Sequence, residues 1–214
     1  MFEELMPEGQ DYKLCKSPES AHYKIIKYVG ANKKVLDVGC GAGYLGEEFK
    51  NNGCYVVGLE SNVARAKTAK GILDNVVIAD AESLSSLSYP EGFFDVIVFT
   101  DILEHLKRPD NILRNFKKYL NKDGFAIISV PNIARIDIRI KLLFGKFRYA
   151  QGGILDRTHL RFFTLDTIQG LVRGAGYKIE KMDFSGFFSK LKILRFLANL
   201  LAFQFILLVR PRSE

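Results

Sequence analysis

A glycine-rich loop between a short strand and a helix constrains this chain more than any other feature. Residues 35–38 are apolar apart from Asp37, residues 39–43 read Gly-Cys-Gly-Ala-Gly, and residues 44–51 have a helical pattern. Glycines at such a turn let the backbone bend sharply and approach a ligand without a Cβ in the way. The following helix begins with free N–H groups. The pattern therefore predicts a ligand-binding turn at the end of a sheet strand.

Asp37 decides between two kinds of ligand for this turn. Gly41, Gly43 and Gly46 match the G-x-G-x-x-G pattern of dinucleotide sites. A carboxylate two residues before Gly39, inside an apolar strand, is costly to bury unless a partner meets it. An ammonium group is a natural partner, directly or through water, whereas a pyrophosphate is not. The sequence therefore favours a ligand with a cationic group over a nicotinamide dinucleotide.

Apolar runs alternate with helical stretches along the rest of the chain. This alternation is typical of βαβ units and of a parallel sheet covered on both faces. The first helix is expected to open at Ser17-Pro18, because proline suits the first helical position, and Thr164 is the expected N-cap of a later helix. The sequence predicts helices over 18–30, 44–51, 62–72, 110–120 and 165–173, and strands over 35–38, 55–59, 76–79, 94–99, 125–130, 177–183 and 203–210.

Two segments fit this scheme less easily. Residues 133–149 are basic and apolar together; their isoleucines alternate as in a strand, while Ile136, Ile140 and Leu143 share a helical face, so periodicity leaves the choice open. Residues 187–209 are rich in Phe and Leu, but their uncharged run is shorter than the roughly 20 residues of a spanning helix. We expect a buried helix and then a buried strand there, with a shallow membrane anchor as the alternative.

Acidic side chains stand at three successive predicted strands. Asp37 lies in the first, Glu60 ends the second and Asp80 ends the third. The carboxyl ends of parallel strands form one edge of a sheet, and open α/β sheets bind ligands there. Glu60 is placed to accept hydrogen bonds from ribose hydroxyls. Asp80 is placed to accept from an adenine amino group, while the N–H of Ala81 or Glu82 meets a ring nitrogen.

Charge is divided unevenly along the chain. Residues 1–105 carry 16 acidic and 10 basic side chains, while residues 106–214 carry 8 and 21. The basic half would attract a phosphorylated substrate, a membrane surface or nucleic acid, or would form a solvated face.

Cys15, Cys40 and Cys54 match neither a zinc pattern nor a disulfide framework, and acids precede the first basic residue, Lys13. We therefore expect a cytoplasmic protein, peripheral to the membrane if its basic surface binds lipid, with reduced thiols and no secretory signal.

Together these motifs resemble those of class I S-adenosylmethionine-dependent methyltransferases. The resemblance covers most of the chain and looks closest to the small-molecule branch that includes ubiquinone-biosynthesis O-methyltransferases. Residues 156–164 also resemble a segment common in bacterial members of that branch. The motifs that carry the resemblance are residues 35–43, Glu60, Asp80, Phe-Asp-Val-Ile at 94–97 and Leu-Glu-His-Leu at 103–106.

The resemblance implies a Rossmann-like α/β fold with a seven-stranded, mostly parallel sheet, helices on both faces and an antiparallel last strand at 203–210. It implies S-adenosylmethionine as methyl donor and S-adenosylhomocysteine as product. Gly39 and Gly41 would pack against the methionine part, and residues 100–102 would lie near the transferred methyl group. The predicted cofactor-binding residues are Asp37, Gly39, Cys40, Gly41, Gly43, Glu60, Ser61, Asp80, Ala81, Glu82, Thr100, Asp101 and Ile102.

His159 is the predicted general base or substrate contact. Histidine is suited to proton transfer near neutral pH, and the segment after the fifth strand can overhang the active site in this fold. The alternative is a structural histidine hydrogen-bonded beside Asp156 or Arg161. His105 and Asp101 complete the catalytic candidates, with a structural or cofactor-pocket role as the alternative for His105.

Asp101, Glu104 and His105 also form a D-x-x-E-H pattern. Some methyltransferases with an E-x-x-E-H version bind a divalent metal there, and His159 is then a candidate fourth ligand. The first acid is one carbon shorter here, and mixed oxygen and nitrogen ligands suit several metals equally. We therefore assign no metal and expect Glu104 and His105 to serve the cofactor pocket and packing.

We expect one methyltransferase domain over 1–214, with an N-terminal helix at 17–34, a lid at 133–163 and an apolar helix and last strand at 185–214. Residues 133–161 carry seven Lys or Arg and two acids. This basic lid suits an amphipathic, anionic acceptor that is lipid-, quinone- or sugar-like, and together with the apolar C-terminal segment it suits contact with a membrane surface.

The competing hypotheses are that the chain is an NAD(P)-dependent oxidoreductase or a non-catalytic membrane- or nucleic-acid-binding module. The three strand-end acids argue against both, and no nucleic-acid motif accompanies the charge.

Overall fold

Seven strands form one sheet in the computed structural model, which describes residues 14–186 and 197–212. The strand order is β3-β2-β1-β4-β5-β7-β6. The first five strands pair in parallel, while β7 runs antiparallel to both β5 and β6. The predicted fold class, with its antiparallel last strand, is confirmed. The strands are β1 (Lys34–Val38), β2 (Tyr55–Glu60), β3 (Asn75–Ile78), β4 (Phe94–Thr100), β5 (Leu120–Pro131), β6 (Tyr177–Phe184) and β7 (Gln204–Pro211).

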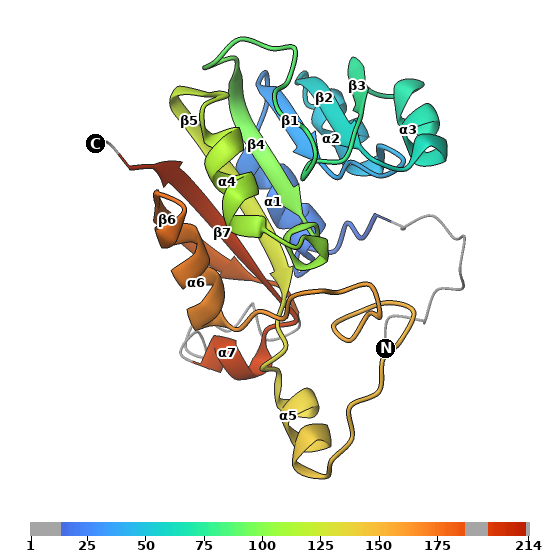
Figure 1. Ribbon diagram of the computed structural model, residues 1–214, viewed down its shortest axis with the longest axis vertical. Helices are drawn as coiled ribbons and strands as arrows, with labels where there is room; N and C mark the ends of the chain where they lie inside the picture. Colours follow the sequence, from blue (N-terminus) through green and yellow to red (C-terminus); the bar gives the residue numbers. More distant parts are fainter. Residues whose placement is uncertain (1–13, 187–196, 213–214) are drawn as a thin grey trace.

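Helices cover the two faces of this sheet (Figure 1). One face carries α1 (Ala21–Val29), α2 (Tyr44–Asn51) and α3 (Val63–Lys70), and the other carries α4 (Pro109–Lys117) and α6 (Leu165–Gly174). The remaining elements lie toward the carboxyl ends of the parallel strands: the 3-10 turn η1 (Leu103–His105), α5 (Ile136–Leu143) and α7 (Ala198–Leu201).

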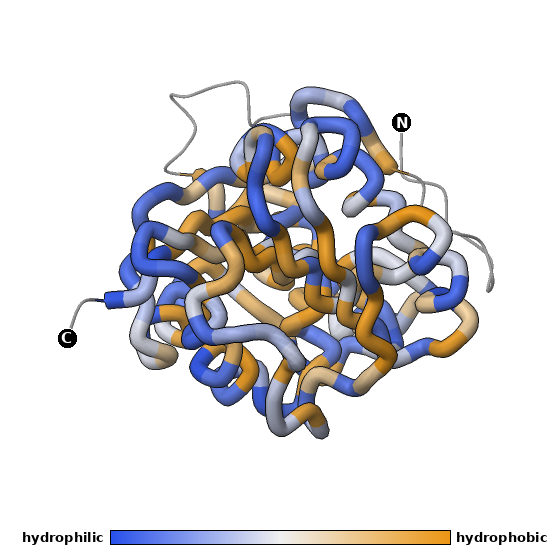
Figure 2. The backbone as a smooth tube through the Cα atoms, turned by 90° about the horizontal axis from the view of Figure 1, so that it is seen from above, coloured by the Kyte–Doolittle hydropathy of each residue, from blue (hydrophilic) through white to orange (hydrophobic). Residues whose placement is uncertain are grey.

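Alternation of side chains along the strands builds one apolar core on each face. In β4, Val96 and Val98 pack with the α1–α3 layer, whereas Ile97 and Phe99 pack with α4 and α6. Successive side chains of a strand point to opposite faces, so a strand buried on both sides must be apolar throughout. Figure 2 shows these hydrophobic strands at the centre of the molecule. The sheet thereby fixes the strand ends on which the predicted site residues stand.

Three predicted element boundaries are wrong, and the others agree within two residues. The first helix begins at Ala21 rather than at the proline, because the Ser20 hydroxyl accepts a hydrogen bond from the Tyr23 N–H and caps it there. The fourth helix stops at residue 117, and β5 already starts at residue 120. Leu120 pairs with Phe94 and Phe125 pairs with Val96, so residues 121–124 lie in an irregularity of the β4–β5 register. The Asn121 amide donates to Asp95 at 2.6 Å.

The two ambiguous segments have different outcomes. Residues 133–149 contain helix α5. The helix expected after residue 187 lies mostly outside the described residues, and α7 is its described end. Ala198, Ala202 and Phe205 are buried in the core, so the described part of the C-terminal segment is internal rather than a surface. Within the described ranges, no helix combines the length and the apolar character needed to cross a membrane.

Candidate functional site

The glycine loop is tied to the end of β2. The Gly39 N–H donates to the Leu59 carbonyl at 2.8 Å. The Gly41 N–H donates to Glu60 Oε2 at 2.9 Å, and the Ser61 hydroxyl lies 3.5 Å from Glu60 Oε1. Glu60 is buried. Its carboxylate therefore spans from the end of its own strand to the loop after β1, and it fixes the loop beside the predicted ribose position.

Two glycines of the loop leave different amounts of space. Gly41 has a φ of +56°, and a Cβ there would meet nothing nearer than the Tyr44 ring at 3.9 Å. Gly39 has a φ of +78°, and a Cβ there would lie 2.9 Å from the Ile102 side chain. The loop is therefore open beside Gly41 and closed by Ile102 behind Gly39. This places Ile102, the residue that follows Asp101, against the loop.

Cys40 contributes only its backbone to this loop. Its side chain is buried, and a Cβ on Gly58 of β2 would lie 2.5 Å from the Cys40 sulfur. Burial raises the pKa of the thiol well above its usual range. The position therefore needs a small side chain that packs over Gly58, and the thiol points into the core rather than toward a ligand.

Asp37 is buried with an unsatisfied oxygen. Its exposed fraction is 2%, and within the described ranges Oδ2 has no hydrogen-bond partner. Burial, followed by the charge of Glu60, raises the pKa of Asp37 to about 7. Thr100 Oγ1 is also buried without a described partner, two residues beyond the β4 register partner of Asp37. Such orphaned groups are costly unless a ligand satisfies them, so the pair fits a polar ligand that carries a cationic group.

The predicted adenine contacts lie in an exposed turn after β3. Asp80 accepts from the Glu82 N–H at 2.9 Å and from the Ser83 hydroxyl at 3.2 Å. The Glu82 carboxylate accepts from the Arg108 N–H at 2.7 Å. Glu82 is therefore engaged within the turn through both its amide and its side chain. Of the two amides predicted to meet a ring nitrogen, Ala81 is the better placed.

Asp101 takes a left-handed backbone conformation, with a φ of +50°. Its Oδ1 accepts from the Ser129 hydroxyl at 3.0 Å, and the Gln204 amide donates to Oδ1 at 2.8 Å and to Oδ2 at 2.7 Å. Burial raises the pKa of Asp101. A non-glycine residue in this region costs roughly 1–3 kcal/mol and persists where its surroundings hold it. Gln204 is not predicted from the sequence as a site residue, because it lies 103 residues away from Asp101 and gives no local signal.

Glu104, His105 and His159 come together although His159 is far away in the sequence. The Glu104 carbonyl accepts from the N–H groups of Leu160 and Arg161 at 2.8 and 3.0 Å, which holds the later segment on the η1 turn. The two imidazole rings are 4.8 Å apart between centroids. His159 Nε2 lies 4.0 Å from Glu104 Oε1. The segment that was predicted to overhang the site therefore delivers His159 to the end of β4.

Both histidines direct Nδ1 toward the backbone. His159 Nδ1 lies 3.2 Å from the Ile154 carbonyl, and His105 Nδ1 lies 3.3 Å from the Thr158 carbonyl. Donation from Nδ1 leaves the Nε2 lone pair available. Burial and then His105 lower the pKa of His159, while burial and then Asp101 raise the pKa of Glu104 well above its usual range. Burial thus favours the neutral form of both groups, and neither Glu104 oxygen has a hydrogen-bond partner within the described residues.

The cluster of Glu104, His105 and His159 is poised for two kinds of chemistry. Their ligand atoms lie within 4.8 Å of one another, whereas Asp101 is turned to Ser129 and stands outside this group. The cluster can move a proton through His159, or it can offer oxygen and nitrogen ligands to a divalent cation. The side chains packed next to it include Pro131 and Phe163, and the space between them and Glu104 and His159 is too small for a water molecule.

Comparisons with known sequences find similar proteins over most of this chain. The family model described as a methyltransferase domain matches residues 12–182. A ubiquinone biosynthesis O-methyltransferase from Proteus mirabilis is 33% identical over 105 residues, which cover 47% of this chain and 42% of that protein. The protein of the same name from Histophilus somni is 35% identical over 109 residues, covering 47% and 45%. The chain thus spans less than half the length of these curated relatives.

Solved structures show the same fold at low identity. A SAM-dependent methyltransferase from Archaeoglobus fulgidus has a TM-score of 0.65 and 20% identity, covering 88% of this chain and 91% of that one. A [4+2]-cyclase has a TM-score of 0.60 and 17% identity, covering 89% and 82%. Because the fold also occurs in a cyclase, fold alone does not name the reaction, and the residues at the strand ends must do so.

Proposed function

Because the chain belongs to the methyltransferase domain family, we propose that it transfers the methyl group of S-adenosylmethionine to a small or amphipathic acceptor. The observation that carries this proposal is the buried, unsatisfied Asp37 carboxylate beside the open backbone of Gly41. An ammonium group satisfies such a carboxylate, and S-adenosylmethionine carries one. A nicotinamide dinucleotide would bring pyrophosphate to the same place, which Asp37 disfavours.

The residues at the strand ends would hold the parts of this cofactor. Asp37 would take the ammonium group, Glu60 the ribose and Asp80 the adenine, with the backbone of residues 39–41 along the methionine part. When bound, the cofactor supplies an electrophilic methyl group on a sulfonium. The fit rests on the orphaned oxygens of Asp37 and Thr100 and on the space beside Gly41.

His159 acts as the general base toward an acceptor hydroxyl, so we propose O-methylation. Its Nδ1 faces the Ile154 carbonyl, and its Nε2 is the basic atom on the side of Glu104. The proton of the acceptor hydroxyl passes to Nε2, which creates an imidazolium 4.0 Å from the nearest Glu104 oxygen. His105 packs its ring against His159 and limits how it turns. Asp101 positions the end of β4 rather than reacting itself, since its oxygens are engaged.

The acceptor class follows from the segment that delivers His159. Residues 133–161 are basic, and the side chains around the cluster include the apolar Ile133, Ile154 and Phe162. An acceptor with an apolar body and an anionic end fits both properties. The curated relatives are named for ubiquinone biosynthesis, which supports a quinone- or lipid-like acceptor over a sugar.

Cofactor binding is expected to strengthen as pH rises through 7. The ammonium group binds the ionised form of Asp37, whose pKa is raised to about 7 in the free protein. Raising the pH from about 6 to about 8 should therefore lower the Kd for S-adenosylhomocysteine about tenfold, with proton release on binding. Calorimetric titration in buffers of different ionisation enthalpy measures both quantities.

The same titration with NAD and NADP tests the competing oxidoreductase. Binding of S-adenosylhomocysteine alone supports the proposal. Binding of a nicotinamide dinucleotide alone contradicts it, and so does a folded protein that binds none of the three.

Treatment with a chelator distinguishes proton transfer from metal binding at the cluster of Glu104, His105 and His159. With His159 as the base, EDTA treatment should change the methylation rate less than twofold, because no ion takes part in the proton transfer. A divalent cation on Glu104, His105 and His159 predicts instead a loss of activity that Mg²⁺ or Mn²⁺ restores. The measurement is the initial rate of methyl transfer to a prenylated hydroquinone before and after chelation.

A further inference from the structure

Apolar side chains are exposed in one segment far more than elsewhere. Helix α5 extends beyond the carboxyl edge of the sheet, at the bottom of Figure 1, and Ile138 anchors it by packing with Ile154 and Leu155. Among the described residues, eight of the twelve large apolar side chains that are exposed lie between Ile136 and Leu160. We call residues 136–149 the α5 tip.

The exposed face of α5 is continuous. Ile136, Ile140, Leu143 and Phe144 recur at helical spacing on the side opposite the buried Ile138. Leu143 is 81% exposed and Phe144 is 70% exposed. A contiguous exposed apolar surface of this kind indicates an interaction site, whereas single exposed apolar residues scattered over a surface do not.

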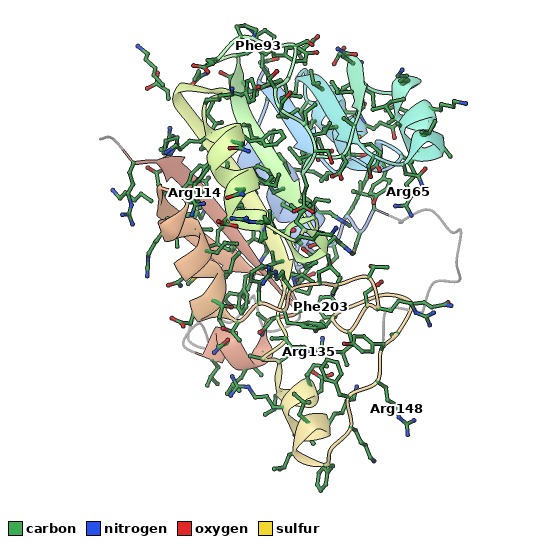
Figure 3. The ribbon with its side chains drawn as sticks, viewed as in Figure 1. Arg65, Phe93, Arg114, Arg135, Arg148 and Phe203 are labelled. Carbon is green, nitrogen blue, oxygen red and sulfur yellow. The ribbon has the colours of Figure 1, made fainter. Side chains whose placement is uncertain are left out.

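Basic side chains surround this apolar face. The acid within the α5 tip, Asp137, is already engaged by Arg135 at 2.5 and 2.8 Å, and Arg135 also stacks on Phe203. Figure 3 shows Arg148 extending away from the body of the molecule, in contrast to Arg135 beside Phe203. Within the described part of the chain, Lys146 and Arg148 form no ion pair. The exposed basic residues here are Arg139, Lys141, Lys146, Arg148 and Arg157.

We propose that the α5 tip docks on a lipid surface that carries anionic headgroups. Leu143 and Phe144 enter the boundary between headgroups and acyl chains, while the surrounding Lys and Arg contact lipid phosphates. Charge complementarity selects this occupant: a nucleic acid would use the basic rim but leave Leu143 and Phe144 in water. A bilayer with anionic lipid satisfies both.

Docking in this way would turn the carboxyl edge of the sheet toward the bilayer. The β5 strand runs directly from the sheet into the α5 segment, which also leads on to His159 (Figure 1). The cluster of Glu104, His105 and His159 would then lie near the lipid from which an amphipathic acceptor comes. This last step rests on the proposed function, whereas the docking itself does not.

Vesicle sedimentation with the full chain tests the apolar part of the surface. Binding is expected to vesicles of phosphatidylcholine with phosphatidylglycerol, and the double variant Leu143→Ser/Phe144→Ser should lower the partition coefficient about tenfold or more. The matched control is Tyr23→Ser/Tyr55→Ser, which removes two apolar side chains of 39% and 40% exposure outside the α5 tip. The control should bind as the unchanged protein does.

Charge reversal tests the basic rim. Lys146→Glu/Arg148→Glu should abolish the preference for anionic vesicles, and added salt should weaken binding of the unchanged protein. Lys122→Glu/Lys178→Glu makes the same charge change on exposed positions at the opposite edge of the sheet and should have little effect.

Tryptophan fluorescence reports insertion directly. The chain contains no tryptophan, so Phe144→Trp provides a single emission from the α5 tip. A blue shift on anionic vesicles, with quenching by lipids brominated near the headgroup, is the expected result. An unshifted spectrum in vesicle-bound protein would overturn insertion.

Other outcomes also overturn the proposal. One is that the unchanged protein does not bind vesicles, and another is that Leu143→Ser/Phe144→Ser binds them as well as the unchanged protein does. A third is that an oligonucleotide displaces the vesicles from the unchanged protein and also binds to the double variant. A dimer that the double variant dissociates, without vesicle binding, would assign the surface to a second copy. Titration of the same variants with S-adenosylhomocysteine in solution should be unchanged, so failure of docking and failure of methyl transfer are told apart.

Discussion

Replacing Asp37 by asparagine is expected to weaken S-adenosylhomocysteine binding at least a hundredfold at pH 8. The variant removes the negative charge that meets the ammonium group, and a buried hydrogen-bonded charge pair contributes several kcal/mol when one partner is lost. The amide has the size of the carboxyl group, so the loop beside Gly41 is left in place. Calorimetric titration of the two proteins measures the effect.

The same substitution should make the unliganded protein more stable at pH 8. The pKa of Asp37 is raised to about 7 in the folded protein, above its value in the unfolded chain, so the folded state binds the proton more tightly. Stability therefore falls as pH rises from about 4 to about 7 and stays lowered above that range. The amide side chain of the variant carries no such charge, and we expect a gain of about 4 kcal/mol at pH 8 that vanishes near pH 4. Urea unfolding at both pH values measures it.

Asp95→Asn is the matched control on the neighbouring strand. Asp95 accepts hydrogen bonds from the Lys34 N–H at 2.7 Å and from the Asn121 amide at 2.6 Å, so it is a satisfied acid at the other end of the sheet. Its replacement should lower stability and leave cofactor affinity unchanged. If Asp37→Asn behaved like this control, Asp37 would be a structural residue and the cofactor assignment would be wrong.

Replacing His159 by glutamine is expected to lower the rate of methyl transfer by about two to four orders of magnitude, the range of general-base contributions. Affinity for S-adenosylhomocysteine should change less than threefold, because His159 lies on the lid segment rather than on the glycine loop. The pKa of His159 is lowered by burial, so the acidic limb of the rate profile should lie below pH 6.5 and disappear in the variant. A merely structural role would lower the rate without removing this limb.

Two further variants complete that test. Glu104→Gln keeps the shape of the cluster but cannot ionise beside a protonated His159, so the rate should fall and the acidic limb should shift. His22→Gln changes a histidine on α1, away from the cluster, and should leave both rate and profile unchanged. Retention of full activity by His159→Gln with a prenylated hydroquinone would assign proton transfer to another group or to water.

The elements that sequence predicts best are those with strong local signals. The strand–loop–helix at residues 34–51 follows from its glycines and from the change of apolar period, and the structure has it as expected. Asn, Asp and Gly at residues 121–124 are typical of a turn, and these residues have no register partner in β4, whereas Leu120 before them pairs with Phe94 and Phe125 after them pairs with Val96. The early start of β5 therefore depends on a tertiary pairing that no local pattern reports.

The site residues likewise divide into those with a local sequence signal and those that only tertiary contacts bring together. The strand-end position of Asp37 and Glu60 could be predicted because parallel strands share one edge. The contact of Glu104 with His159 and that of Asp101 with Gln204 join residues 55 and 103 positions apart, and no periodicity reports them. The D-x-x-E-H pattern groups Asp101 with Glu104 by sequence, but Gln204 and Ser129 draw its carboxylate elsewhere.

The place of β7 sets the order in which the site can be completed during synthesis. β7 follows β6 along the chain but pairs between β5 and β6, and β6 has no other partner in the described sheet. The Gln204 amide that fixes Asp101 arrives with β7. A nascent chain in which β7 has not yet left the ribosome therefore presents an unpaired β6 and an Asp101 without its amide partner, so the carboxyl edge of the sheet is completed only after β7 has emerged.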